Sequence, residues 1–279
     1  MKDNHATPKA ILRLTGLVCW TLVLLLPSLG GQLLTGRAPR KITHLWYRGA
    51  CTLLGLDIEM SGEPLKATPV LFVANHISYL DILALGASID TGFIAKSEVG
   101  RWPVIGYLAR LARTVFVERS KRSSSGRQRD AIIERLAGGE NLVLFAEGTS
   151  SDGTEVLPFK STLFSAVEAK SLTDHVALQP LTIAYNRQGC AWYGDMEFVP
   201  HLWQMLGQPR TGVNVLLHDA LPVSTVTNRK NLAAAAQRIV ADGLHQMRSS
   251  SRTDAIPHEA AGLVARSSGN RQQPITSRP

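Results

Sequence analysis

The sequence lacks the cysteine pairs that a disulfide framework or a zinc site would need. Its 279 residues include three cysteines, at positions 19, 51 and 190, with no CxxC pair and no histidine at a zinc-like spacing. An odd number of isolated cysteines is typical of a reducing compartment. The HExxH motif is missing as well, which argues against a metal-dependent hydrolase. The sequence therefore predicts no metal site.

Acidic residues are scarce relative to basic ones. The chain carries 30 Lys and Arg residues against 22 Asp and Glu, a formal net charge of +8, and 44% of its residues are hydrophobic. This composition predicts a globular protein with an acidic partner, such as nucleic acid, an anionic lipid surface or an acidic carrier protein. Nucleic acid is disfavoured, because no binding motif is present and aromatic residues are not interleaved with the basic cluster.

No charged residue occurs between Leu14 and Gly36. This stretch is about long enough to cross the ~30 Å hydrocarbon core as a helix, but Pro27, Gly30 and Gly31 argue against one continuous straight helix. We therefore expect a membrane-attached segment that is broken or lies in the interface. A cleaved signal peptide is the rival interpretation, because basic residues precede the stretch and small residues follow its apolar run. Basic residues flank both ends, so charge leaves the orientation open.

Strand-like and helix-like segments alternate after the apolar stretch. This pattern predicts an α/β fold with a central mixed sheet flanked by helices. The expected strands are Val70–Ala74, Gly92–Ala95, Thr114–Val117, Leu142–Phe145, Ala177–Ala184 and Val213–Leu217. The expected helices are His44–Leu56, Leu80–Gly86, Val104–Ala112, Arg127–Ala137, Thr162–Ala169 and Arg229–Met247. We divide the chain into N-terminal anchoring or interfacial helices (1–60), a globular domain (61–248) and a disordered polar tail (249–279).

A histidine and an aspartate follow the first of these strands. The stretch VLFVANHISYLD, residues 70 to 81, reaches His76 just past the strand and Asp81 five residues later. Strand ends of this kind are where α/β sites are built, and a histidine base needs an acid to hold its tautomer. The two side chains meet only if His76 lies in the turn and Asp81 on the first helical turn. The competing interpretation is a capping box, with Ser78 as N-cap and Asp81 as the third helical residue. On the spacing alone, we favour the capping interpretation.

A second strand ends in a carboxylate and a glycine. The stretch LVLFAEGTSSDG, residues 142 to 153, places Glu147, Gly148 and Thr149 past the strand. Gly148 would let backbone N–H groups approach an oxyanion closely. Such a turn is common by itself, but two polar strand ends in one domain favour a site.

A third strand ends in a basic run. The stretch RTVFVERSKR, residues 113 to 122, reaches Arg119 directly after its apolar residues. A charge run is more often a solvated face, yet a guanidinium at a strand end suits carboxylate or phosphate recognition. We expect this region to face an acidic carrier protein or anionic lipid.

Together these segments resemble the four sequence blocks of the glycerolipid acyltransferase family, the bacterial 1-acylglycerol-3-phosphate acyltransferases and relatives. The resemblance covers roughly residues 69 to 184. Within the family, EGTSSDGTEVLPFKSTLFSA looks most like the branch that acylates lyso-ornithine lipid in bacteria. The residues that carry the resemblance are Asn75-His76 with Asp81, Phe116 with Arg119, Phe145 with Glu147-Gly148-Thr149, and Gln179-Pro180-Leu181.

The resemblance implies acyl transfer to the hydroxyl of a lyso-lipid. The donor would be an acyl carrier protein or coenzyme A thioester, with no cofactor, and the enzyme would sit on the bacterial inner membrane, facing the cytoplasm. His76 would act as general base, and Asp81 would hold the imidazole and stabilise the imidazolium. The residues implied to bind substrate are Asn75, Phe116, Arg119, Glu147, Gly148, Thr149 and Lys160.

The sequence departs from the phosphate-accepting members at three positions. Those members usually have Pro and Arg where Ala146 and Ser150 stand, and Gly where Arg113 stands. Without an arginine at position 150 a phosphate contact is lost, although Arg113 or Lys160 can substitute. The sequence therefore favours lyso-ornithine lipid as acceptor and leaves 1-acylglycerol-3-phosphate as the alternative.

Overall fold

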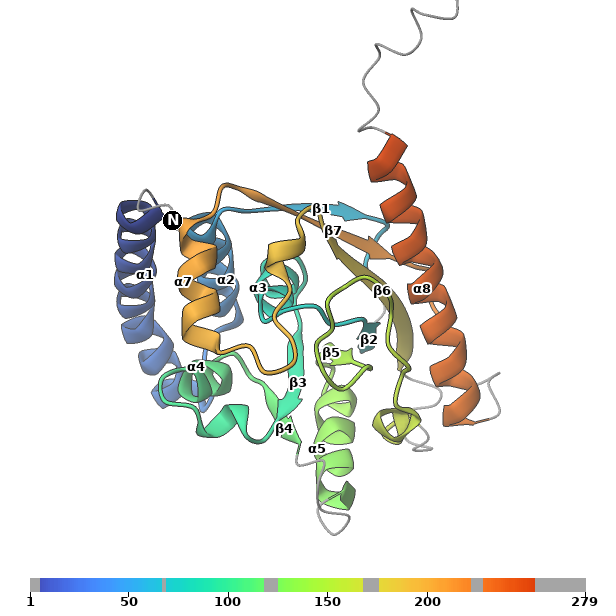
Figure 1. The fold of residues 1–279 in the computed structure, drawn as a ribbon. Helices are drawn as coiled ribbons and strands as arrows, with labels where there is room; N and C mark the ends of the chain where they lie inside the picture. The colour runs from blue at the N-terminus through green and yellow to red at the C-terminus, as the bar shows by residue number, and fades with distance from the viewer. Residues whose placement is uncertain (1–5, 67–68, 118–124, 168–175, 222–227, 254–279) are drawn as a thin grey trace, which may run out of the picture.

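A seven-stranded sheet lies at the centre of the molecule, with helices on both faces (Figure 1). The structure is a computed structural model, and it describes residues 6–66, 69–117, 125–167, 176–221 and 228–253. The strands are β1 (Leu56–Ser61), β2 (Val70–Ala74), β3 (Gly92–Lys96), β4 (Val115–Val117), β5 (Leu142–Phe145), β6 (Ala177–Tyr185) and β7 (Thr211–Leu217). The helices are α1 (Ala6–Thr35), α2 (Arg40–Leu54), α3 (Leu80–Ser88), α4 (Ile105–Leu111), α5 (Ser125–Ala137), α7 (Phe198–Gly207) and α8 (Arg229–Thr253).

The sheet is mixed, as expected. Its strand order is β1-β7-β6-β2-β5-β3-β4, and every neighbouring pair is parallel except β6 and β7. Ala74 at the end of β2 lies level with Phe145 of β5 and Leu181 of β6. Because these three strands run in the same direction, the residues that follow them meet at one sheet edge.

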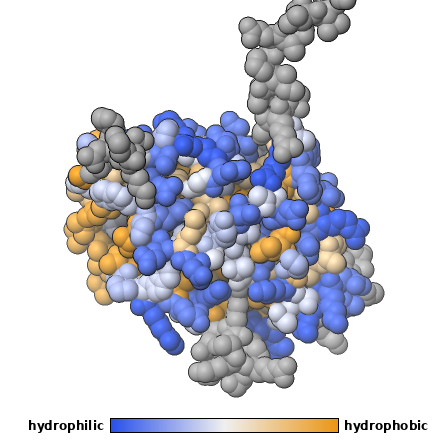
Figure 2. All heavy atoms as spheres, viewed as in Figure 1, coloured by the Kyte–Doolittle hydropathy of each residue, from blue (hydrophilic) through white to orange (hydrophobic). Residues whose placement is uncertain are grey.

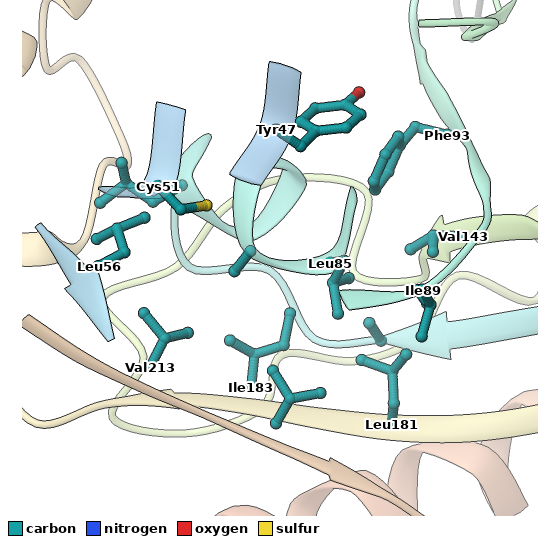
Figure 3. Packing of buried hydrophobic residues seen from close by; sticks show 14 of the residues in the cluster. Tyr47, Cys51, Leu56, Leu85, Ile89, Phe93, Val143, Leu181, Ile183 and Val213 are labelled. Atoms are coloured by element: carbon teal, nitrogen blue, oxygen red, sulfur yellow. The ribbon is translucent and has the colours of Figure 1, made fainter. Parts of the chain in front are cut away.

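Strand β2 is buried on both faces, which fixes the position of the residues after it. All five of its side chains are buried. Phe72 packs with α2 and α3 on one face, while Leu71 and Val73 pack with α5 and α8 on the other. Figure 3 shows the first core, in which Tyr47 of α2 and other apolar side chains of α2 and α3 pack over β6. Burial of this kind stabilises by about 1.5–3 kcal/mol per large apolar side chain.

The apolar N-terminal stretch forms one continuous helix, so the expected break is wrong. Pro27 lies inside α1 and removes only one backbone donor. Gly31 allows close packing instead, because a Cβ there would clash with the Pro39 ring. Trp20 packs over Gly49 of α2 in the same way, and a Cβ at Gly49 would clash with its indole. Close contact with α2 therefore holds the helix together across its proline and glycines.

Helix α1 presents an apolar outer face. Residues Pro8–Thr35 are long and apolar enough to cross a membrane, and 6% of their most apolar window is buried. Leu26, Leu33 and Leu34 are 75%, 86% and 87% exposed. Figure 2 shows hydrophobic residues gathered at the left of the molecule, where Figure 1 places α1. This face indicates association with a membrane.

The remaining elements differ from expectation at a few places. Strand β1 and helix α7 were not expected, and β1 begins inside the segment assigned to the anchor and pairs with β7. The expected helix Thr162–Ala169 is instead a 3-10 helix, Ser161–Phe164, and residues 168–175 lie outside the described part. Helix α8 runs to Thr253, past the start of the expected tail. The three-part division otherwise stays a prediction.

Candidate active site

His76 and Asp81 form a hydrogen-bonded pair at the carboxyl end of β2. His76 lies in the loop after the strand, and Asp81 lies in the first turn of α3 and points back toward it. His76 Nδ1 and Asp81 Oδ2 are 2.8 Å apart. The Asp81 side chain is 0% exposed and that of His76 is 18% exposed. The pair thus has a buried acid behind an imidazole that solvent or substrate can reach.

Both oxygens of the Asp81 carboxylate accept hydrogen bonds from the protein. Oδ2 accepts from the backbone N–H groups of Ile77 at 2.7 Å and Ser78 at 3.1 Å. Oδ1 accepts from the Tyr185 hydroxyl at 2.7 Å. Burial raises the pKa of Tyr185 well above its usual range, and the nearby Asp81 charge raises it further, so Tyr185 stays a neutral donor. These contacts fix the orientation of the carboxylate.

This arrangement fixes the tautomer of His76. A carboxylate that already accepts three donors is an acceptor toward the ring, so Nδ1 carries the proton and donates to Asp81. The other ring nitrogen, Nε2, is then free of a proton. The ring face stacks on Phe145, with centroids 4.0 Å apart and planes 20° apart. The imidazole is therefore held both by its edge and by its face.

The capping interpretation is half right. Tyr79, not Ser78, precedes the first residue of α3, and no side chain caps the helix. The Ser78 hydroxyl is buried without a hydrogen-bond partner among the described residues. Asp81 does accept the Ser78 N–H, as the acid of a capping box does. A single carboxylate thus serves both the helix start and the imidazole.

The Glu-Gly-Thr segment braces the backbone of His76. Glu147, which is 1% exposed, accepts the His76 N–H at Oε1 over 3.0 Å. The Ser151 N–H donates to the His76 carbonyl at 2.8 Å. Burial raises the pKa of Glu147 to about 8, while the hydrogen bond from His76 acts in the opposite direction. Around neutral pH this side chain is therefore mainly a neutral acid.

The residues after Glu147 form a turn that opens to solvent. Gly148 is buried at φ +74°, a left-handed conformation that favours glycine, and its N–H donates to the Phe145 carbonyl at 3.1 Å. Thr149 is exposed. Lys160 is exposed and its backbone N–H donates to the Ala146 carbonyl at 2.9 Å, which brings it beside the same turn. Glu147, Gly148, Thr149 and Lys160 are thus close in the fold to His76.

Asn75 contacts the protein itself. Its amide donates to the Ile183 carbonyl at 2.9 Å and accepts the Ile183 N–H at 2.8 Å, and the side chain is 1% exposed. These two bonds tie the end of β2 to β6 where regular pairing stops. The predicted contact between Asn75 and substrate stays a prediction.

Phe116 lies in β4, three strands from β2, or roughly 14 Å away at ~4.8 Å per strand. The Arg110 guanidinium lies 5.8 Å from the centre of its ring, and Gly100 approaches the same ring. The structure does not bring Phe116 together with His76. Arg119 lies outside the described residues.

Tyr185 is the main site residue that the sequence analysis missed. It is the last residue of β6, which runs parallel to β2, so it ends at the same sheet edge as His76. A hydroxyl at the end of a buried strand was the signal that would have found it. Trp192 was missed as well; its backbone N–H donates to the Ile77 carbonyl at 2.9 Å and holds the loop that carries His76.

Known proteins resemble this chain in sequence. A family model described as Acyltransferase matches residues 57–184. The lyso-ornithine lipid O-acyltransferase of Rhizobium meliloti is 41% identical over 210 residues, which cover 70% of this chain and 72% of that protein. The 1-acyl-sn-glycerol-3-phosphate acyltransferase of Neisseria gonorrhoeae is 35% identical over 171 residues, which cover 60% and 67%.

A crystal structure shares the fold. The 1-acyl-sn-glycerophosphate acyltransferase of Thermotoga maritima matches with a TM-score of 0.58 at 21% identity, covering 86% of this chain and 98% of that chain. Sequence and fold together define an enzyme that transfers acyl groups. The chain belongs to the acyltransferase family of lipid O-acyltransferases, as its sequence blocks predicted.

Proposed function

We propose that the enzyme transfers a fatty acyl group from a thioester to the hydroxyl of lyso-ornithine lipid, with His76 as general base. Nε2 takes the hydroxyl proton as the oxygen bonds to the thioester carbonyl carbon. The tetrahedral intermediate then expels the thiolate, breaking the C–S bond, and the imidazolium returns the proton to sulfur. The observation that carries this mechanism is the 2.8 Å contact of Nδ1 with a buried, fully held Asp81.

Asp81 assists in this scheme through its charge and its position. Its carboxylate stabilises the imidazolium that forms when Nε2 takes a proton, and its contacts with Ile77, Ser78 and Tyr185 keep it from turning away. General base catalysis of this kind contributes roughly 10²–10⁴-fold. A metal-ligand role for Asp81 fits poorly, because protein donors already occupy both oxygens.

The acceptor head group would bind beside the Glu-Gly-Thr turn. Glu147, Gly148 and Thr149 follow β5 at the same edge as His76, and Lys160 supplies a positive charge next to the turn. Asn75 acts in this proposal by holding the end of β2 on β6. Phe116 and Arg119 keep their substrate-binding roles on the strength of the family resemblance alone.

Lyso-ornithine lipid is the acceptor we favour over 1-acylglycerol-3-phosphate. Relatives named lyso-ornithine lipid O-acyltransferases are 34% to 41% identical to this chain over more than 200 residues each. Ser150 stands where phosphate-accepting members usually have arginine, so it cannot make the charge-assisted phosphate contact. Its small side chain leaves room for a zwitterionic ornithine amide.

The same proposal places the enzyme on the cytoplasmic side of the bacterial inner membrane. Helix α1 lies along the domain rather than apart from it, because Lys9 and Arg13 donate to the Gln208 carbonyl beyond α7 at 2.9 and 2.8 Å. We infer that α1 lies in the membrane interface with its leucines in lipid. The net charge of +8 supports an acidic acyl carrier protein as donor.

The test is an assay of the purified protein with both acceptors and both donor types. Lyso-ornithine lipid with acyl carrier protein thioester is expected to react fastest, and His76→Ala is expected to be inactive while folded. Turnover of 1-acylglycerol-3-phosphate alone would contradict the acceptor and leave the acyl transfer standing. Normal activity in folded His76→Ala would end the mechanism.

A further inference from the structure

Arginine side chains surround a cavity at the sheet edge opposite His76. Arg113 precedes β4 and Glu140 precedes β5, whereas His76 follows β2, and these strands run in the same direction. The cavity has a volume of about 310 Å³, and no acidic residue lines it among the described residues. Its polar and aromatic lining includes Gln32, Arg37, Arg110, Arg113, Phe116 and Arg135.

The positive charge of this cluster is only partly compensated. Glu140, with 6% of its side chain exposed, accepts from Arg37 at 3.1 Å, Arg113 at 2.5 Å and Arg135 at 2.7 Å. One carboxylate thus faces three guanidiniums. Arg110 adds a further charge and donates to the neutral Gly100 carbonyl at 2.5 Å. A bound anion would be stabilised by this excess.

The pKa of Arg113 reflects the same excess of positive charge. Burial lowers the pKa of Arg113, and the neighbouring guanidiniums of Arg37, Arg40 and Arg135 lower it further, against the effect of Glu140. Arg113 also has φ +61°, an uncommon conformation for a residue with a side chain. The chain therefore holds this guanidinium inside the cluster despite an electrostatic and a conformational cost.

The surroundings of the cavity identify the source of the anion. Gln32 and Gly36 at the end of α1 line it, and Leu33 and Leu34 on the same turn are 86% and 87% exposed. A free anion would not contact the adjacent leucines. A phospholipid presents a phosphate to the arginines and acyl chains to the leucines together. The volume is at the small end of ligand sites and suits a head group rather than a whole lipid. Arginine forks match phosphate geometry.

We propose that this cavity binds the phosphate of an anionic phospholipid, whose acyl chains lie against the exposed leucines of α1. Phe116 is the one lining residue with a proposed substrate role; the arginines of the cluster are separate from the catalytic pair, since Arg113 precedes β4 whereas His76 follows β2. It would fix the amino edge of the sheet at the membrane surface, and with it the height of His76 above the bilayer. The proposal does not depend on which acceptor the enzyme uses.

The test compares two double variants of equal charge in the full-length protein. Arg37→Gln with Arg110→Gln removes two exposed cluster arginines, while Arg129→Gln with Arg210→Gln removes two exposed arginines elsewhere. Sedimentation with phosphatidylcholine vesicles, with and without phosphatidylglycerol, measures binding. Each charge lost within a Debye length of an anionic membrane weakens binding by a similar amount, whether or not it contacts a lipid. We expect the cluster variant to lose about tenfold more affinity for phosphatidylglycerol vesicles than the control, with equal binding to phosphatidylcholine.

Equal losses in the two double variants would mean diffuse attraction and would overturn the site. Short-chain phosphatidylglycerol should bind the wild type more tightly than inorganic phosphate does, and equal affinities would overturn the lipid assignment. Loss of acyl carrier protein binding, with vesicle binding intact, would assign the cluster to the carrier and overturn the proposal. Glu140→Gln, which removes the only acid paired with these three arginines in the described residues, should tighten phosphatidylglycerol binding if it folds.

Discussion

The hydroxyl of Tyr185 donates to Asp81 Oδ1 at 2.7 Å across 104 positions of sequence. The other oxygen of Asp81 faces His76 at 2.8 Å, so the two sides of one carboxylate connect the last residue of β6 to the imidazole. This link lets the sheet, rather than the loop alone, determine where His76 points. We therefore propose that Tyr185 is a positioning residue, acting through Asp81.

Replacing Tyr185 with phenylalanine tests that role. The buried Oδ1 would lose its donor, which costs about 1–3 kcal/mol, and Asp81 would be free to turn. We expect kcat to fall about tenfold with KM nearly unchanged, because the acceptor and donor sites are not touched. Tyr193→Phe, which removes a hydroxyl from an exposed tyrosine, is the control. A fall in stability without a fall in kcat would assign Tyr185 to the fold alone.

Asp81→Asn separates charge from geometry. The amide oxygen can accept the N–H groups of Ile77 and Ser78 while its NH₂ donates to Tyr185, so the ring keeps its neighbours but loses the carboxylate charge. Turnover should drop by ~10²–10⁴-fold, close to the whole contribution of base catalysis. Steady-state rates and thermal unfolding measured on the same samples decide the matter. If Asp81 only starts α3, the variant loses about 1 kcal/mol of stability and keeps its activity.

Ser150→Arg is expected to shift acceptor preference toward 1-acylglycerol-3-phosphate. A charge-assisted arginine–phosphate contact contributes ~1.5–3 kcal/mol, or about one to two decades in kcat/KM. The ratio of kcat/KM values for the two acceptors is the quantity to measure. Gln204→Arg adds the same charge on α7 and should leave the ratio unchanged. An equal ratio in all three proteins would show that residue 150 does not read the head group.

Glu147 should make stability depend on pH. Because its pKa is raised from 4.5 to about 8, the folded protein keeps a proton that the unfolded chain releases. Stability therefore falls as pH rises from about 4.5 to about 8, by at most ~5 kcal/mol at 1.36 kcal/mol per pKa unit. Glu147→Gln removes this loss, so its advantage over wild type should grow with pH in urea unfolding. Parallel pH profiles would contradict the buried acid, and exposed Glu155→Gln is the matched control.

Local sequence patterns predicted the centre of the sheet well. Strands β2 and β5 have the expected bounds, because continuous apolar runs bounded by polar residues are typical of buried parallel strands. Strand β1 was missed because Asp57 and Glu59 make it look polar, and only pairing with β7 selects the extended form. Helix α7 was missed because of Pro200, which is harmless in the first turn, where no N–H partner is lost.

The site residues differ in the same way. His76 and Asp81 are near neighbours in sequence, so a turn that joins them could be proposed, but only the second polar strand end and the family resemblance favoured it over a capping box. Tyr185 and Trp192 reach the same loop only through the strand order. The continuity of α1 likewise depends on contacts between two segments, in which Trp20 and Pro39 pack against glycines. The sequence pattern of one segment alone does not reveal such contacts.

The long separation between α1 and Tyr185 has a consequence for synthesis. About 150 residues lie between the end of α1 at Thr35 and Tyr185, which takes roughly 8 to 30 s to translate at ~5–20 residues per second. The apolar helix therefore leaves the ribosome well before the chain can complete the support of Asp81. We expect a nascent chain to stay inactive until β6 has joined β2, because only then does Tyr185 reach Asp81.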